Sequence, residues 1–338
     1  MVQTQKQNSY QADGSPRRLV HHNFMVSDVA KTIEFYNQVL GIEETFRIGK
    51  NVGFLSNGNT HHDLGFSEVS DSTRNKGDEI RGMGITEMSP EWGKKAGLNH
   101  FAYEMYNEAE LLSAYDRLLE FGVKPYLLDD RIVTKSVYFV DPEGNGVEYT
   151  VDMLTNWRDY RKPGASLDHK PYVPHEELPD TQTYINMDPE VRRVDEAALH
   201  AKRASHSMMV AKDFAGLRRF YIDVVGLKEM FLSPDGEFSV LQGKDFPGYS
   251  FTIAAESPNR PVGVRYIGFE MVDSDDIVRA EELLASRDVK VEYKVLHAKK
   301  QVVAFRDPDN VLIQCYIEEP DFLDALPGMD PSLAMLLV

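Results

Sequence analysis

Two histidines and one glutamate in the first half of the chain are side chains of the kind that bind metals, and the second half lacks the full set. The three are His21, His100 and Glu148, whose counterparts in a repeated pattern are His206, Tyr266 and Gln314. Two neutral imidazoles and one carboxylate that leave coordination positions open form the facial triad suited to Fe(II) and O₂ chemistry. The first half is therefore predicted to bind a metal, and the second half to be its structural twin.

The correspondence depends on two sequence patterns that each occur twice. The first pattern, His-x₆-Asp-x₆-Phe-Tyr, begins at His21 and begins again 185 residues later at His206. The second is an Asp-Pro turn ahead of Glu148, which recurs 166 residues later ahead of Gln314. Repetition at a fixed spacing indicates duplicated supersecondary units.

Periodicity and turn residues place these side chains on strands. Residues 19–26 alternate around His21 as a strand, and Asp28 then caps a helix that ends at Gly41. Further strands complete this unit, and the same order of elements recurs in three later units. Four βαβββ modules, two per domain, predict an α+β fold with two cupped, barrel-like sheets.

The repeat boundaries divide the chain into five expected parts. These are a flexible N-terminal tail over residues 1–18, a metal-binding catalytic domain over 19–153, a connector over 154–203, a degenerate domain over 204–319 and a C-terminal tail over 320–338. The connector is predicted to contain a short helix near residues 190–202. The apolar end of the C-terminal tail is expected to pack on a neighbouring part of the protein.

Composition narrows the class of protein. The chain has 338 residues and a formal net charge of −17, which argues against binding to nucleic acid or anionic lipid. Its single cysteine, Cys315, excludes an intrachain disulfide and suits a reducing cytoplasm. The polar first residues lack the apolar core of a signal peptide, and no apolar run reaches the roughly 20 residues that span a bilayer. We therefore expect a cytoplasmic protein without membrane or nucleic-acid partners. We separately predict that it forms a homo-oligomer.

Two further side chains are candidates for catalysis. His62 begins a His-Asp-Leu-Gly-Phe segment that is predicted to be the last strand of the first unit. If its imidazole faces the cup without binding the metal, it could move a proton near neutral pH; the alternative is a histidine at a polar strand end. Alternation along that strand places His61 on the opposite face. Tyr138 is either a core aromatic or a hydrogen-bond donor to bound oxygen.

The other histidines and Trp92 are not predicted to bind the metal or to transfer protons. His206 and His297 lack the partners of a metal site and are expected to be structural. Trp92 lies in a Ser-Pro-Glu-Trp-Gly loop, where it either covers the cup or sits at the surface. His22 is predicted to point away from His21, because neighbouring strand residues face opposite sides of a sheet.

At these residues the sequence resembles the vicinal oxygen chelate superfamily and, within it, the type I extradiol ring-cleaving dioxygenases. The resemblance covers about residues 19–153 and 204–318. The superfamily resemblance rests on His-x₆-Asp-x₆-Phe-Tyr and on Asp-Pro, each present twice. The resemblance to ring-cleaving dioxygenases rests on the His-Asp strand at 62–66 and on Val-Tyr-x-x-Asp-Pro-x-Gly-x-x-x-Glu over 137–148.

This resemblance implies a non-haem Fe(II) enzyme, with Mn(II) as the alternative metal. Its substrates would be O₂ and a small aromatic diol of the catechol or hydroquinone type, whose ring it would cleave. His21, His100 and Glu148 would bind the metal. His62 would be the acid/base, and Tyr138 would donate a hydrogen bond near the substrate.

One residue of the family signature is missing. Family members carry a histidine a few residues before the Val-Tyr pair, whereas this chain has Asp129, Asp130 and Arg131 there. A carboxylate could hold a proton near bound oxygen, a guanidinium could pair with an acidic substituent of the substrate, and a solvated turn is the alternative. In many two-domain members the metal lies in the second half, so in this chain the site is expected to have moved to the first.

Two other functions use the same fold. A glyoxalase-like isomerase or lyase would need a fourth protein ligand, for which His62 or Asp63 is suitably placed. A resistance-type protein that sequesters an aromatic ligand would need no metal triad. Metal content and oxygen uptake together distinguish the three functions.

Overall fold

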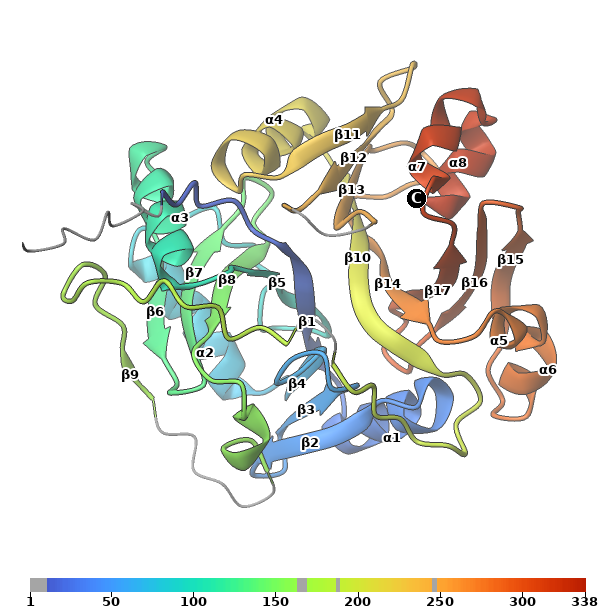
Figure 1. Ribbon diagram of the computed structural model, residues 1–338, viewed down its shortest axis with the longest axis horizontal. Helices are drawn as coiled ribbons and strands as arrows, with labels where there is room; N and C mark the ends of the chain where they lie inside the picture. The colour runs from blue at the N-terminus through green and yellow to red at the C-terminus, as the bar shows by residue number, and fades with distance from the viewer. Residues whose placement is uncertain (1–10, 163–168, 187–188, 245–247) are drawn as a thin grey trace, which may run out of the picture.

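Two mixed β-sheets, one from each half of the chain, form the computed structural model (Figure 1). The structure describes residues 11–162, 169–186, 189–244 and 248–338. The strands of the first sheet are β1 (Arg18–Val26), β2 (Glu43–Ile48), β3 (Val52–Ser56), β4 (Leu64–Glu68), β5 (Gly97–Glu104), β6 (Leu127–Asp130), β7 (Thr134–Val140), β8 (Gly146–Asp152) and β9 (Lys170–Pro171). Those of the second are β10 (Ala201–Ala211), β11 (Lys228–Leu232), β12 (Phe238–Gln242), β13 (Phe251–Ala255), β14 (Gly263–Met271), β15 (Val291–Leu296), β16 (Lys300–Arg306) and β17 (Leu312–Glu318).

The two sheets share one strand order. It is β2-β3-β4-β1-β5-β8-β7-β6-β9 in the first sheet and β11-β12-β13-β10-β14-β17-β16-β15 in the second. Strand β1 pairs in parallel with β4 and antiparallel with β5, and β10 pairs in the same way with β13 and β14. The predicted α+β class with repeated modules is therefore confirmed. Each sheet remains open and has two edge strands, so neither is a closed barrel.

Helices connect the strands and cover the sheets. Those of the first half are α1 (Val29–Leu40), α2 (Asp71–Gly82), α3 (Glu108–Glu120) and the 3₁₀ turn η1 (Trp157–Asp159). Those of the second half are α4 (Phe214–Arg219), the π-helical turn η2 (Phe220–Val224), α5 (Ser274–Val278), α6 (Ala280–Ala285), α7 (Phe322–Ala325), the 3₁₀ turn η3 (Leu326–Gly328) and α8 (Pro331–Leu337). In the segments that the structure describes, we find no helix with the length and apolar character needed to cross a bilayer.

Helix α1 begins and ends where the sequence predicts. The Asp28 carboxylate accepts a hydrogen bond from the Lys31 amide at 3.0 Å, which caps the first turn. Gly41 ends the helix with φ of 69°, a left-handed conformation that glycine adopts at little cost. The two helix ends thus fix where the chain leaves β1 and where it enters β2.

The two halves meet through reciprocal contacts between the repeated sequence patterns. Tyr36 of α1 donates a hydrogen bond to Asp307 at 3.1 Å, and Tyr221 of η2 donates one to Asp141 at 3.0 Å. Each tyrosine belongs to the His-x₆-Asp-x₆-Phe-Tyr pattern and each aspartate to the Asp-Pro turn of the other half. Helix α1 also packs in a core that includes Phe269 of the second sheet. Strands β1 and β10 consequently lie next to each other in the middle of the molecule (Figure 1).

Segments outside the sheets pack on them. Residues 1–10 of the expected flexible tail lie outside the described residues, whereas the backbone amides of Asp13 and Gly14 donate to the Glu110 carboxylate of α3 at 3.0 and 2.7 Å. The helix expected near residues 190–202 is wrong. Residues 195–199 form turns and bends, and 201–202 begin β10. Amides of the segment bond to carbonyls at the end of α1, among them Leu199 N to Val39 O at 2.8 Å. These long-range hydrogen bonds replace those that a local helix would have made.

Candidate metal centre

The register of the first sheet brings the three predicted ligands together. His21 on β1 is opposite Ala102 on β5, and Ala102 is opposite Glu148 on β8. Because Ala102 carries only a methyl group, the side chains on either side meet above it, and His21 Nε2 lies 3.0 Å from Glu148 Oε2. His100 precedes Ala102 by two residues and so shares its face, with Nε2 at 2.9 Å from the same oxygen.

The triad is buried, and the pKa shifts of His100 and Glu148 favour the forms that bind a metal. One ligand atom from each of His21, His100 and Glu148 lies within 4.8 Å of the others. Burial lowers the pKa of His100 and so favours the neutral imidazole. Burial by itself would raise the pKa of Glu148, but the two histidines outweigh it and hold that pKa well below its ordinary value. A neutral imidazole and an ionised carboxylate are ligands for divalent cations.

Two asparagines select one tautomer of His100. The Asn99 side-chain oxygen lies 3.0 Å from His100 Nδ1, so that nitrogen carries the proton of the neutral ring. The Asn23 amide nitrogen lies 3.0 Å from Nε2 and can donate to its lone pair. Nε2 also lies 2.9 Å from Glu148 Oε2, so a cation that took the Nε2 lone pair in place of Asn23 would reach the carboxylate as well. The residues present thus fit a divalent metal.

A cavity of about 170 Å³ is lined by His100 and Glu148 of the triad and by His62. Tyr138 lines it from β7, opposite Glu148, and its ring lies edge-on to that of His100 with centroids 5.4 Å apart. Burial, followed by the Glu148 carboxylate, raises the pKa of Tyr138 well above its ordinary value, so the phenol remains a donor. Trp92 also lines the cavity, and its indole donates to the Asn99 carbonyl at 2.9 Å. Of its two alternatives, the surface position is therefore wrong.

His62 lies in the loop before β4 and not on the strand expected for it. Its ring packs against that of His21 with centroids 4.0 Å apart, and against Phe54 at 4.9 Å. Within the described part of the chain, both of its ring nitrogens are buried without a hydrogen-bond partner. Burial, reinforced by the nearby histidines, lowers the pKa of His62 well below its ordinary value. The side chain is thus a neutral imidazole with free nitrogens beside the triad.

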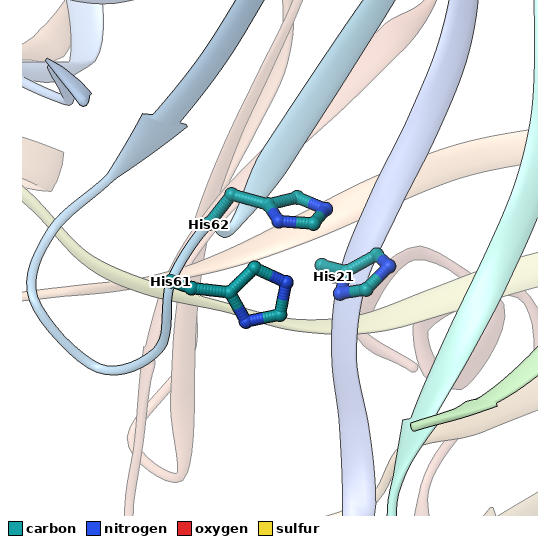
Figure 2. A group of neighbouring side chains, drawn as sticks. All are labelled: His21, His61 and His62. Carbon is teal, nitrogen blue, oxygen red and sulfur yellow. The ribbon is translucent and has the colours of Figure 1, made fainter. Parts of the chain in front are cut away.

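The expectation that His61 faces away from the cup is wrong. Residues 61 and 62 precede the strand, so the alternation of strand side chains does not apply to them. Figure 2 shows the rings of His21, His61 and His62 gathered at one place. Their ligand-type atoms lie within 4.8 Å of one another and form a second group that shares His21 with the triad. His61 Nδ1 lies 3.7 Å from the Asp152 carboxylate.

Two neighbours of these histidines have structural partners. Asp63 accepts hydrogen bonds from the amides of Asn57 at 2.9 Å and of Ala204 at 3.2 Å, so one oxygen closes its own loop and the other fixes that loop to the second half. His22 lies on the opposite face of β1, as predicted, with Nε2 at 2.6 Å from the Ser207 hydroxyl of β10.

One of the three residues in place of the missing signature histidine reaches the cavity. Arg131 lines it, and its Nε donates to the buried Asp129 carboxylate at 2.6 Å. Asp130 instead lies 3.5 Å from Lys170 of β9. Two further residues line the cavity, Lys76 of α2 and Arg161 after η1. No motif in their segments of the sequence indicated a functional site.

The matching position of the second half is filled by its own side chains and by the C-terminal segment. His206 Nε2 lies 3.3 Å from Gln314 Oε1, with Gly268 between the two strands where the first half has Ala102. Gln314 donates to the Leu336 carbonyl at 2.9 Å, and Tyr266 donates to that of Val338. His297 is half-buried and accepts from the Lys299 amide at 3.2 Å. Among the described residues, both groups of metal-type side chains lie in the first half.

Sequence comparison relates both halves of the chain to known proteins. A family model described as "Glyoxalase/Bleomycin resistance protein/Dioxygenase superfamily" matches residues 18–149 and 203–315. Biphenyl-2,3-diol 1,2-dioxygenase 2 of Rhodococcus globerulus is 36% identical over 67 residues. That alignment covers 20% of this chain and 35% of the Rhodococcus protein, so it relates part of each.

Comparison of structures shows the same fold in two kinds of enzyme. The 2,3-dioxygenase LapB from Pseudomonas sp. KL28 has a TM-score of 0.63 at 15% identity, over 90% of this chain and 93% of that one. The Mn(II)-bound glyoxalase from Novosphingobium aromaticivorans has a TM-score of 0.62 at 12% identity, over 89% and 82%. The fold is thus common to a dioxygenase and a glyoxalase, and the choice between them depends on the side chains of the site.

Proposed function

Because the chain belongs to the Glyoxalase/Bleomycin resistance protein/Dioxygenase superfamily, we propose that it is a non-haem Fe(II) extradiol dioxygenase acting on a small aromatic diol. The observation that carries the proposal is the neutral His62 imidazole, buried with two free nitrogens beside the triad. Ring cleavage requires a base for a diol hydroxyl close to the metal, and this imidazole has no other partner among the described residues. The Rhodococcus globerulus relative bears the name of a diol dioxygenase, which is the same class.

In this proposal each side chain of the site has one role. His21, His100 and Glu148 would hold the Fe(II), with Mn(II) as the alternative, and the ion would supply adjacent open positions for the diol and O₂. His62 accepts the proton of one diol hydroxyl and later returns it. Tyr138 donates a hydrogen bond to an oxygen of the reacting pair. Both atoms of O₂ enter the product and one ring C–C bond breaks, so no external reductant is consumed.

A glyoxalase-like isomerase is the second candidate, and the group of His21, His61 and His62 favours it. In that reaction His62 would be a further metal ligand, since its ligand-type atoms lie within 4.8 Å of those of His21. Asp63 is unavailable for this role because both of its oxygens accept backbone hydrogen bonds. The two functions therefore differ in whether His62 binds the metal or moves a proton.

Metal analysis of anaerobically prepared protein, combined with an oxygen-electrode screen of catechols and hydroquinones, tests the proposal. We expect one metal per chain and O₂ uptake in a one-to-one ratio with diol. Bound metal without uptake would favour the isomerase, and absence of both would favour a protein that sequesters an aromatic ligand. His21→Ala should lose the metal, and His206→Ala, the matched change in the second half, should keep it. Light scattering tests the predicted homo-oligomer.

A further inference from the structure

Three cationic side chains from separate elements line the cavity beside the candidate metal centre. They are Lys76 of α2, Arg131 between β6 and β7, and Arg161 after η1. The chain as a whole has a net charge of −17, so the positive charge at this cavity is opposite in sign to the net charge of the protein. A cavity lined by one sign of charge attracts a ligand of the opposite sign.

The carboxylates near these cations do not balance them. Asp129 pairs with Arg131 through Nε at 2.6 Å. Glu148 also lines the cavity, but its Oε2 faces both His21 and His100 at 3.0 and 2.9 Å. Within the described ranges, neither Lys76 nor Arg161 has a carboxylate at ion-pair distance. The cavity wall therefore keeps positive charge that an anionic ligand can neutralise.

Arg161 gives the strongest evidence for an anionic ligand because its side chain is buried. Only 5% of the residue is exposed, and its guanidinium lies over the Phe46 ring at 5.5 Å from the centroid. Its Nη2 donates to the Arg131 carbonyl at 3.1 Å, and this hydrogen bond holds the guanidinium in the cavity wall. Burial and then repulsion by Arg131 lower the pKa of Arg161 to about 10. A buried cation is costly unless an anion accompanies it, so the site is built for a charged partner.

Aromatic side chains contribute another part of the wall. Phe46 and Phe54 stack with ring centroids 4.3 Å apart, and Tyr126 lines the same cavity. Such a surface packs against an aromatic ring. We propose that the substrate is an aromatic diol that carries a carboxylate, whose charge pairs with Arg161 and Arg131 while its hydroxyls face the triad. Guanidinium groups suit this role because their planar donors match a carboxylate. This inference rests on the proposed function.

The test compares an acid with its neutral ester in the Fe(II)-loaded full chain. The probes are 3,4-dihydroxyphenylacetate and its methyl ester, with kcat/KM measured by oxygen uptake. We expect the acid to be preferred by about tenfold or more, the range of one hydrogen bond between charged groups. Arg161→Met should lower the acid-to-ester ratio about tenfold, and Arg161→Lys should retain part of it. Arg158→Met, an arginine that does not line the cavity, should retain the whole ratio.

A binding measurement separates this inference from the proposed function. Calorimetry with 4-hydroxyphenylacetate and its methyl ester, which lack the diol, reports recognition of the carboxylate without turnover. The inference is supported if the acid binds more tightly than the ester and if Arg161→Met and Arg131→Met each weaken binding of the acid. This holds even if no diol consumes O₂. Equal kcat/KM and equal affinity for acid and ester would overturn it, even if the dioxygenase activity is found.

Discussion

Replacing His62 by alanine separates proton transfer from metal binding. A general acid/base group contributes roughly 10²–10⁴ in rate, which corresponds to about 3–5 kcal/mol of barrier. We therefore expect turnover of the diol to fall by that factor. The metal content should remain at one per chain, because the triad of His21, His100 and Glu148 is complete without His62.

The structure also bounds the cost to stability of this change. Both nitrogens of His62 lack a hydrogen-bond partner in the described structure, so truncation leaves no buried polar group unpaired. What is lost is the packing of the ring against His21 and Phe54, at centroid distances of 4.0 and 4.9 Å. Loss of a buried ring costs about 2–4 kcal/mol. His62→Phe restores much of this packing without the nitrogens and serves as the control for volume.

The assay measures three quantities on each variant: metal per chain by elemental analysis, kcat by oxygen electrode at saturating diol, and the free energy of unfolding in urea. Both variants should show the same loss of kcat, while only the alanine variant loses stability. Loss of metal in both variants would identify His62 as a ligand and would refute the acid/base assignment. Turnover within a few-fold of the parent protein would refute it as well.

Three further predictions follow from other contacts. Glu148→Gln should fold, because Gln314 fills the matched position in the second half, but it should lose the metal in elemental analysis. His206→Ala should leave oxygen uptake within a few-fold of the parent protein, and a loss as large as that of a triad variant would show that the second half is catalytic. Burial raises the pKa of Asp307 to about 6, so the folded state holds a proton that the unfolded state has released, and stability falls as pH rises from 3.8 to 6. Asp307→Asn removes this pH dependence. The free energy of unfolding in urea, taken as variant minus parent protein, should therefore rise by up to about 3 kcal/mol from pH 4 to pH 7. The same difference at both pH values would contradict the prediction.

The sequence alone predicted the modules and the residues of the triad because both follow from strand periodicity together with repetition at fixed offsets. Side chains on a strand alternate with period two, so His21 and His22 had to face opposite sides. The fixed offsets of the repeated patterns then identified which strand positions correspond between the halves. Once His100 and Glu148 are placed on the two neighbouring strands, the register of the sheet brings all three side chains to one point.

Only the tertiary structure placed the side chains that surround the triad, because no local period governs them. His61 and His62 precede their strand, so loop backbone and not alternation decides where the rings point. Lys76 comes from a helix between modules and Arg161 from the connector, and each reaches the cavity by packing of segments distant in sequence. Long-range hydrogen bonds likewise overrode the helical pattern near residues 190–202. The positions of the candidate ligands follow from strand geometry, whereas the cavity wall is set by how the loops and the connector pack on the sheet.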